Sequence, residues 1–171
     1  RDYLFHVGSE FKYRYSYGSS KFAQNRAAAQ RLREALFFRI KLDASTYSGS
    51  RFAFQVRDLR EIRSSAKLVF WARGASGKER FLVGLGSESA SHTIRSRVAI
   101  PPARALSTKW QKIEIPLSSF PDLGYAWDGK KSWRLPLDWS RVIEFEISHA
   151  PTRVGGKNLE VLIGPVWLEG S

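Results

Sequence analysis

Short runs in which apolar and polar residues alternate recur along almost the whole chain, and they constrain its fold more than any other feature. The clearest run is KLVFWARG at residues 67–74, where Leu68, Phe70 and Ala72 form one alternate set. A period of two is that of a β-strand with two different faces. Clusters of glycine, serine and proline separate about nine or ten such runs at regular spacing, which is typical of an antiparallel β-sandwich or barrel. We therefore predict an all-β fold.

The chain has the length of a single domain. Its 171 residues are enough to bury a substantial core, and we predict one β-sandwich domain over residues 1–171. The chain begins at Arg1 and contains no methionine, so we expect a module or a processed chain of a larger protein. It contains no cysteine, which excludes disulfides and thiolate metal sites.

Residues 19–33 differ from the rest because they are rich in good helix formers. The sequence AQNRAAAQRLREAL occupies residues 23–36, and Ser19 or Ser20 is suited to cap the start of a helix. We predict one short helical insertion near residues 20–35. The alternative is an irregular loop that leads into the next strand.

Residues 67–86 contain two alternating runs separated by Gly74-Ala75-Ser76-Gly77. Because glycines tolerate the positive φ angles of tight turns, we predict that the two runs form a β-hairpin. This hairpin would place Trp71, Arg73 and Arg80 together on one face as a platform for a ligand. The alternative is that Trp71 belongs to the core and that the arginines form a solvated face.

A set of polar and aromatic residues elsewhere fits the same pattern. If the strands that carry these residues are neighbours, the side chains on the polar faces of those strands form a basic groove with an aromatic floor. Tyr125, Trp127 and Trp133 lie in a polar segment, residues 123–137, that we expect to be a long loop folding over the core or meeting a ligand. The residues expected to bind a ligand are Gln55, Arg57, Trp71, Arg73, Arg80, Arg95, Arg97, Tyr125, Trp127 and Trp133.

The charge of the chain favours an anionic partner. Lysine and arginine number 28 against 16 acidic residues, giving a formal net charge of +12. A field of that sign attracts acidic polysaccharide, nucleic acid or an anionic membrane. No nucleic-acid recognition motif is present, and no apolar run approaches the length of a membrane-spanning helix.

Catalytic motifs are absent from the sequence. His6, His92 and His149 are far apart, and no metalloprotease, nucleophile-elbow or phosphate-loop pattern occurs. Glu144 and Glu146 share one face of a strand, as the paired acids of a glycosidase would. The favoured interpretation is a solvated face opposite Lys or Arg on a neighbouring strand. We therefore predict that the chain is not an enzyme, with a polysaccharide lyase or hydrolase as the less favoured alternative.

Several segments in one order resemble the galactose-binding-like jelly rolls, which include non-catalytic carbohydrate-binding modules. They are YSG at 47–49, KLVFWARGASGKE at 67–79, KWQKIEIPL at 109–117, DWSRVI at 138–143 and NLEVLIGPVWLEG at 158–170. The resemblance implies two antiparallel sheets, one of which offers a groove to a sugar chain. Such modules often hold a structural calcium through an Asp in the last strand. Gly164 or Pro165 takes that place here, so we expect no cofactor.

The resemblance and the charge together suggest a function. We predict non-catalytic binding of an acidic, uronate-type polysaccharide, because a neutral cellulose-type chain would not require so many arginines. The alternative is a protein-interaction or sensory and assembly domain of the same fold, since fold does not determine function. A carbohydrate-binding module of this kind would act outside the bacterial cytoplasm, in the periplasm or at the cell surface.

Overall fold

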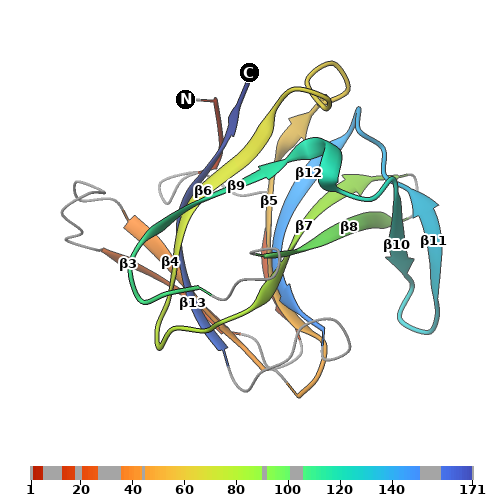
Figure 1. The fold of residues 1–171 in the computed structure, drawn as a ribbon. Coiled ribbons are helices and arrows are strands. Elements are labelled where there is room, and N and C mark those ends of the chain that lie inside the picture. The colour runs from red at the N-terminus through yellow and green to blue at the C-terminus, as the bar shows by residue number, and fades with distance from the viewer. Residues whose placement is uncertain are drawn as a thin grey trace.

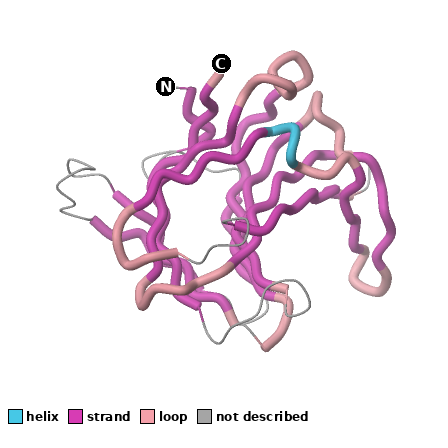
Figure 2. Tube along the Cα trace, in the orientation of Figure 1, coloured by secondary structure: helices cyan, strands magenta, loops and turns pink. Residues whose placement is uncertain are grey.

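The computed structural model describes residues 2–5, 13–17, 21–26, 36–43, 45–89, 92–100, 106–150 and 159–170. Within these residues the chain forms two antiparallel β-sheets, traced in Figure 2, and one short 3-10 helix, η1 (Leu117–Ser119). The predicted all-β sandwich is therefore confirmed.

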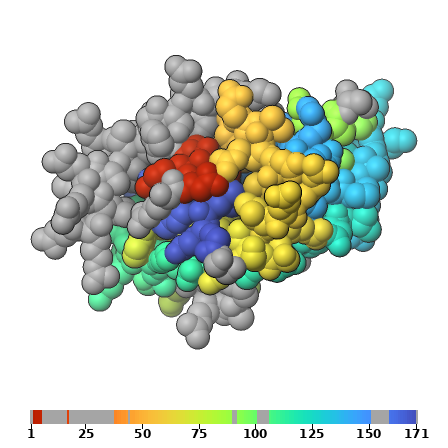
Figure 3. Space-filling view, turned by 90° about the horizontal axis from the view of Figure 1, so that it is seen from above, coloured from red at the N-terminus to blue at the C-terminus, as the bar shows by residue number. Residues whose placement is uncertain are grey.

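The first sheet, sheet A, has six strands, and its central strand β13 pairs with β4, β6 and β1. Its strands are β3 (Lys21–Arg26), β4 (Leu36–Leu42), β13 (Leu159–Glu169), β6 (Lys67–Gly74), β9 (Gln111–Pro116) and β1 (Asp2–Phe5). In Figure 3 the first strand lies directly beside the last, and Tyr3 packs edge-on against Trp167 with ring centroids 6.3 Å apart.

The second sheet, sheet B, has seven strands, and it carries most of the polar pattern noted in the sequence. In spatial order its strands are β11 (Ser132–Pro136), β10 (Leu123–Trp127), β8 (Thr93–Ile100), β7 (Phe81–Glu88), β12 (Val142–His149), β5 (Ser48–Arg57) and β2 (Tyr13–Tyr17). Figure 1 shows this sheet facing sheet A across the sandwich. No helix in the described part of the chain has the length and apolar character needed to cross a membrane.

The core between the sheets is built around phenylalanines from both layers. Phe52 of β5 stacks on Phe5 of β1 at 5.3 Å and lies 5.0 Å from Phe38 of β4. Phe70 of β6 meets Phe145 of β12 edge-on at 5.6 Å. All five are essentially inaccessible to solvent, and burial of each such side chain contributes about 2 kcal/mol. This core fixes which alternate set of each strand points inward.

The predicted hairpin over residues 67–86 is wrong, because β6 belongs to sheet A and β7 to sheet B. The chain crosses from one sheet to the other through Ala75–Arg80, where Gly77 and Lys78 have φ angles of 86° and 68°. The buried carboxylate of Glu79 accepts hydrogen bonds from the backbone N–H and the hydroxyl of Ser76, both at 2.7 Å. The glycine-containing turn therefore connects two strands of different sheets. Alternation within a strand does not reveal which strand it pairs with.

The predicted helix near residues 20–35 is wrong over Lys21–Arg26, which form strand β3 paired with β4. Residues 27–35 lie outside the described part of the chain. A short helix gains little from propensity alone, so hydrogen bonding to the edge of a sheet overrides it.

The segment expected to be a long loop, residues 123–137, is a regular β-hairpin. Strands β10 and β11 pair from Leu123 opposite Pro136 to Trp127 opposite Ser132. In the turn, the carboxylate of Asp128 accepts the backbone N–H groups of Lys130 at 2.8 Å and Lys131 at 2.9 Å. Gly129 supplies a φ of 92°. This hairpin extends sheet B and gives its aromatic residues fixed positions on two opposite faces.

Candidate functional site

The side of sheet B that points away from the core carries a compact polar arrangement on three adjacent strands. We call this side the outer face of sheet B. Each strand contributes two residues of one kind, spaced by two positions, and the register aligns them in two rows. The rows are Arg95–Gly86–Glu144 and Arg97–Gly84–Glu146, from β8, β7 and β12 respectively.

The two glycines of the middle strand give the glutamates the space in which to lie across it. A Cβ atom on Gly86 would stand 2.8 Å from Glu144 Oε2, and one on Gly84 would stand 3.2 Å from Glu146 Oε1. The first distance is shorter than real Cβ contacts allow. The glutamate side chains therefore extend over β7 and reach the arginines of β8.

Glu144 is completely buried, and Arg95 binds its carboxylate through both oxygens. Arg95 donates from Nε to Glu144 Oε2 at 2.6 Å and from Nη2 to Oε1 at 3.0 Å. The two parallel hydrogen bonds form the fork geometry that makes an arginine–carboxylate pair strong and directional.

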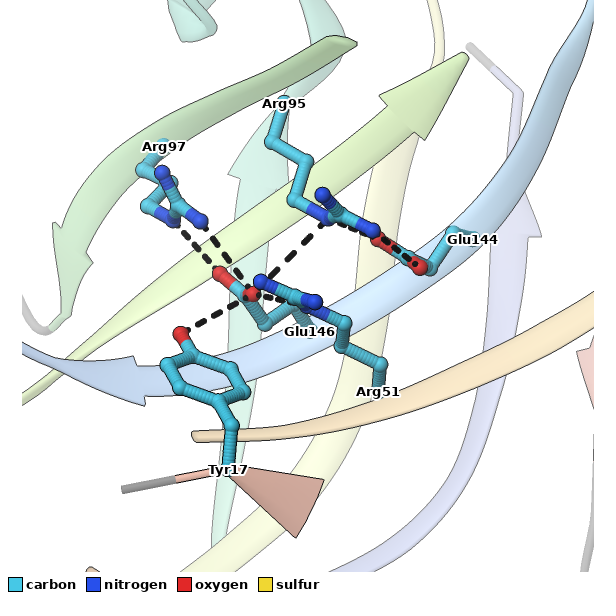
Figure 4. A network of polar contacts seen from close by, with 6 residues as sticks. All are labelled: Tyr17, Arg51, Arg95, Arg97, Glu144 and Glu146. Carbon is cyan, nitrogen blue, oxygen red and sulfur yellow. Dashed lines mark hydrogen bonds and ion pairs between the residues drawn. The ribbon is translucent and has the colours of Figure 1, made fainter. Parts of the chain in front are cut away.

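Glu146 contacts four side chains, as Figure 4 shows: three donate hydrogen bonds to it, and Arg95 Nε forms a longer ion pair with its Oε2 at 4.0 Å. Arg97 donates from Nε to Oε1 at 2.5 Å and from Nη2 to Oε2 at 3.2 Å. On the other side of β12, Arg51 of β5 donates from Nε to Oε2 at 2.8 Å, and the Tyr17 hydroxyl of β2 donates to the same oxygen at 3.1 Å. The Arg51 guanidinium also lies over the Tyr17 ring, 4.2 Å from its centroid. The network thus joins five strands of sheet B.

Burial and charge act in opposite directions on Glu146. Burial by itself raises the pKa of this carboxyl, but attraction and hydrogen bonding from Arg97 and then Arg51 outweigh it and hold the pKa well below its ordinary value. Burial, together with the negative charge of Glu146, raises the pKa of Tyr17 to about 12. At neutral pH the carboxylate is therefore charged, and the phenol is a hydrogen-bond donor.

Next to this network lies an exposed aromatic edge on β10. Tyr125 is directly opposite Arg95 in the register, so it shares the outer face. Trp127 lies two residues further along the same face, and the two side chains are 47% and 59% exposed. Arg134, opposite Tyr125 on β11, places its guanidinium 5.4 Å from the centre of the Tyr125 ring.

Four of the predicted binding residues come together on the outer face of sheet B: Arg95, Arg97, Tyr125 and Trp127. The prediction that Trp71 and Arg73 share this groove is wrong, because β6 lies in sheet A. Trp71 is opposite Lys112 of β9. Arg73 donates to the carbonyl oxygen of Thr108 at 3.3 Å and stacks over Trp110.

The other four predicted residues have no contact with the arginine–glutamate network among the contacts of the described residues. Arg57 is ion-paired with Asp2 of β1 at 2.6 Å, and Arg80 is exposed in the crossover before β7. Gln55 is exposed on β5, where the pairing with β12 shifts register. Trp133 faces inward from β11, packs against the core and meets His92 edge-on at 4.7 Å. Its sequence neighbour Arg134 takes the outward position instead.

Sequence reasoning missed several members of the site, namely Tyr17, Gly84, Gly86, Arg51, Arg134, Glu144 and Glu146. We expected the two glutamates on a solvated face opposite Lys or Arg. Arginine partners are present, but both carboxylates are buried. The available signal was the repetition of one spacing, R-x-R, G-x-G and E-x-E, in three different strands, which gains meaning only when those strands are neighbours.

The arrangement does not resemble a hydrolytic pair of acids. A glycosidase general acid needs a raised pKa and access to the sugar oxygen, whereas Glu146 is buried under arginines that lower its pKa. Among the described residues, no group of three or more His, Asp or Glu side chains is placed to hold a metal ion. The absence of a calcium site stays a prediction.

Comparisons with known proteins agree with the fold and add a family. The model of the family described as Carbohydrate binding domain 30 matches residues 14–167. No curated protein matches the chain at a significant level.

Solved structures share the architecture at low sequence identity. A crystal structure of a family 30 carbohydrate-binding module is 15% identical, with a TM-score of 0.75 over 99% of this chain and 98% of that one. The family 11 module from Clostridium thermocellum, in complex with a β-1,3-1,4-mixed-linked tetrasaccharide, is 14% identical, with a TM-score of 0.68 over 99% and 95%. An exo-β-agarase is 14% identical, with a TM-score of 0.66, and this chain covers 25% of it. With the family model matching most of its length, this chain belongs to the carbohydrate-binding module family 30.

Proposed function

We propose that this chain binds a polysaccharide along the outer face of sheet B without cleaving it. The observation that carries the proposal is the pair of exposed rings, Tyr125 and Trp127, beside a rigid floor of planar polar groups. Sugar rings present C–H groups on their faces and hydroxyls at their edges. An aromatic ring suits the first, and arginine and carboxylate groups suit the second.

The network of arginines and glutamates supports this proposal through its rigidity. Arg95 and Arg97 are each held by two hydrogen bonds to a buried carboxylate, so their guanidinium planes are fixed before any ligand arrives. Binding then costs little side-chain entropy. A floor of this kind is suited to an extended chain that crosses several strands.

The same network bears on the charge of the ligand. The prediction of an acidic polymer relied on a groove rich in arginines. Of the predicted arginines, Arg95 and Arg97 lie in this arrangement, and both are ion-paired with Glu144 and Glu146. A carboxylate on the ligand would meet two buried carboxylates beneath these arginines. We therefore assign the floor to hydroxyl recognition, and an acidic specificity stays a prediction.

The proposed site has consequences for where the chain works. Polysaccharides are too large to enter cells intact, so we propose that the module acts outside the cytoplasm, in the periplasm or at the cell surface. We also propose that it serves within a larger protein and holds that protein on its polymer.

The proposal is tested by affinity electrophoresis of the purified chain through gels that contain mixed-linked β-glucan, hydroxyethylcellulose, agarose or polygalacturonate. We expect at least one polymer to retard the protein, and we expect Tyr125→Ala and Trp127→Ala to reduce the retardation. Loss of one stacking ring is expected to weaken binding by about tenfold, corresponding to roughly 1–1.5 kcal/mol.

Tyr3→Ala is the matched control, because Tyr3 is 41% exposed but lies on β1 of sheet A. It should leave the retardation unchanged. Failure of every polymer to retard the wild-type chain would contradict the proposal and favour a protein-interaction domain. Equal effects of Tyr3→Ala and Trp127→Ala would show that the outer face of sheet B is not the site.

A further inference from the structure

We infer that Arg134 recognises an acidic substituent, a carboxylate or a sulfate ester, on the polysaccharide that occupies the outer face of sheet B. This inference rests on the proposed function and adds a charge preference to one end of that site. It assigns to a residue absent from the predicted set the recognition of acidic groups that we first expected of the predicted arginines as a group.

Three arginines of the outer face are already ion-paired with buried glutamates. On the floor of the site, Arg51, Arg95 and Arg97 all donate to Glu144 or Glu146 at 3.2 Å or less. Three positive and two negative charges in mutual contact leave a small net charge on the floor. An incoming anion would have to compete with carboxylates that are already buried and fully oriented.

Arg134 differs from these three arginines in its exposure and its partners. It is exposed on β11, and among the described residues it has no carboxylate within ion-pair distance. Its guanidinium borders the Tyr125 ring at 5.4 Å from the centroid, a cation–π contact that restrains the side chain and leaves its N–H groups available. A guanidinium held in this way is suited to bidentate pairing with a carboxylate or sulfate.

Other charged side chains of the β10–β11 hairpin have contacts of their own. The Asp128 carboxylate is occupied by the backbone N–H groups of Lys130 and Lys131, which lowers its pKa through those hydrogen bonds. Lys131 Nζ lies 5.6 Å from the centre of the Trp133 ring, which is the inward-facing ring of the hairpin. Arg134 is therefore the hairpin cation that stands beside the exposed ring of Tyr125.

A sugar stacked near Tyr125 would thus have its edge next to a restrained guanidinium. An anionic group on that edge gains an ion pair, whereas a hydroxyl gains one hydrogen bond. The floor, with its arginines satisfied internally, offers an anionic group no additional ion pair. The charge preference of the site is therefore expected to reside in Arg134.

The experiment uses polymers that differ only in charge. A neutral polymer that retards the chain is converted in part to its uronate form by oxidation of its primary alcohols, and in a parallel sample to its sulfate ester. Dissociation constants for all three forms are measured at low and moderate salt for wild type, Arg134→Gln and Arg134→Lys. Arg39→Gln is the matched control, because Arg39 is also exposed but lies on sheet A.

We expect wild type to prefer an acidic form over the neutral one by about three- to fivefold at low salt, which is the size of a surface ion pair. Arg134→Gln should remove this preference, because it weakens affinity for the acidic form more than affinity for the neutral polymer. Arg134→Lys should keep part of it, since charge remains but the fork geometry is lost. Arg39→Gln should keep all of it, which separates a local contact from general attraction by the basic chain.

Each outcome decides the inference. A preference for the uronate form alone identifies a carboxylate as the ligand group, and a preference for the sulfate form alone identifies a sulfate. An unchanged preference in Arg134→Gln, or no preference in wild type, overturns the inference and leaves the proposed function standing. Failure of wild type to bind any of the polymers, neutral or charged, overturns both.

Discussion

Glu146 of β12 accepts a hydrogen bond from Nε of Arg97 at 2.5 Å, although strand β7 lies between the two residues. The contact is possible because the residue of β7 at this point is Gly84, which has no side chain to block the glutamate. The outer face of sheet B is thereby tied together across its strands as well as along its backbone hydrogen bonds.

Removing the charge of Glu146 should destabilise the fold strongly. Glu146→Gln removes the carboxylate to which the partly buried Arg97 and Arg51 guanidiniums donate. Breaking a buried ion pair on one side typically costs about 3–5 kcal/mol. The measurement is the free energy of unfolding in urea at pH 7.

Glu114→Gln provides the control for this change. Glu114 is an exposed carboxylate that contacts Lys67 and Lys112 at 3.5 and 3.7 Å. Loss of such a surface pair should cost less than about 1 kcal/mol. Similar losses in the two variants would show that the buried network contributes no more than a surface pair.

Adding a methyl group to β7 should also destabilise the protein. Gly86→Ala would place Cβ 2.8 Å from Glu144 Oε2 and 3.0 Å from Glu144 Cβ, so the Arg95–Glu144 pair must move. We expect a loss of about 1–3 kcal/mol in unfolding free energy, as for overpacked sites. Gly164→Ala in β13 meets nothing closer than 3.5 Å and should change stability far less. A tolerated Gly86→Ala would mean that the glutamates do not depend on this space.

Acid should remove the stabilisation that Glu146 provides. Its pKa in the folded protein lies below the ordinary value of 4.5. The contribution is therefore complete above about pH 5 and is lost as the pH falls from there toward the folded pKa. Melting temperatures measured from pH 7 to pH 2.5 should fall more steeply in wild type than in Glu146→Gln. Parallel curves for the two proteins would contradict the lowered pKa.

High pH should destabilise the fold by ionising the Tyr17 hydroxyl. Its pKa is about 12 in the folded protein, above the ordinary value of 10, so its contribution to stability is complete below about pH 10 and declines as the pH rises toward 12. In a titration of phenolate absorbance, Tyr17→Phe should remove an ionisation near pH 12 and leave the earlier ones unchanged. Loss of an ionisation near pH 10 instead would contradict the buried environment of this ring.

Trp71 and Trp127 should differ sharply in their effect on binding. Both are tryptophans on strands, but Trp71 lies on sheet A and Trp127 on the outer face of sheet B. Trp71→Ala should leave polysaccharide affinity within about twofold, while Trp127→Ala should weaken it by about tenfold. Circular dichroism spectra of both variants establish that they remain folded. A large loss of binding in Trp71→Ala would move the site to the other sheet.

The strands themselves could be predicted well from the sequence, because period-two alternation reflects which residues face the core. The inward set of β6, namely Leu68, Phe70 and Ala72, is buried as the alternation predicts. The resemblance to carbohydrate-binding modules also agrees with the family that the chain matches. Local pattern was enough for these points because burial of one strand face is a local property.

Two local signals were misleading for physical reasons. Helix formers around residues 20–35 did not prevent Lys21–Arg26 from pairing with β4, since backbone pairing at a sheet edge outweighs a propensity of a few tenths of a kcal/mol per residue. The glycines at 74 and 77 mark a change of direction, but a hairpin and a crossover between sheets can use the same turn residues.

The sequence by itself determined the all-β class, the faces of most strands and the presence of arginines and aromatic residues in polar positions. Only the tertiary structure decided that Arg95 and Arg97 stand beside Glu144 and Glu146, while Trp71 and Arg73 lie on the opposite sheet. The physical reason is that strands far apart in sequence become neighbours through non-local pairing, which alternation within one strand does not encode. Whether an arginine is free to meet a ligand or already holds a carboxylate depends on that pairing.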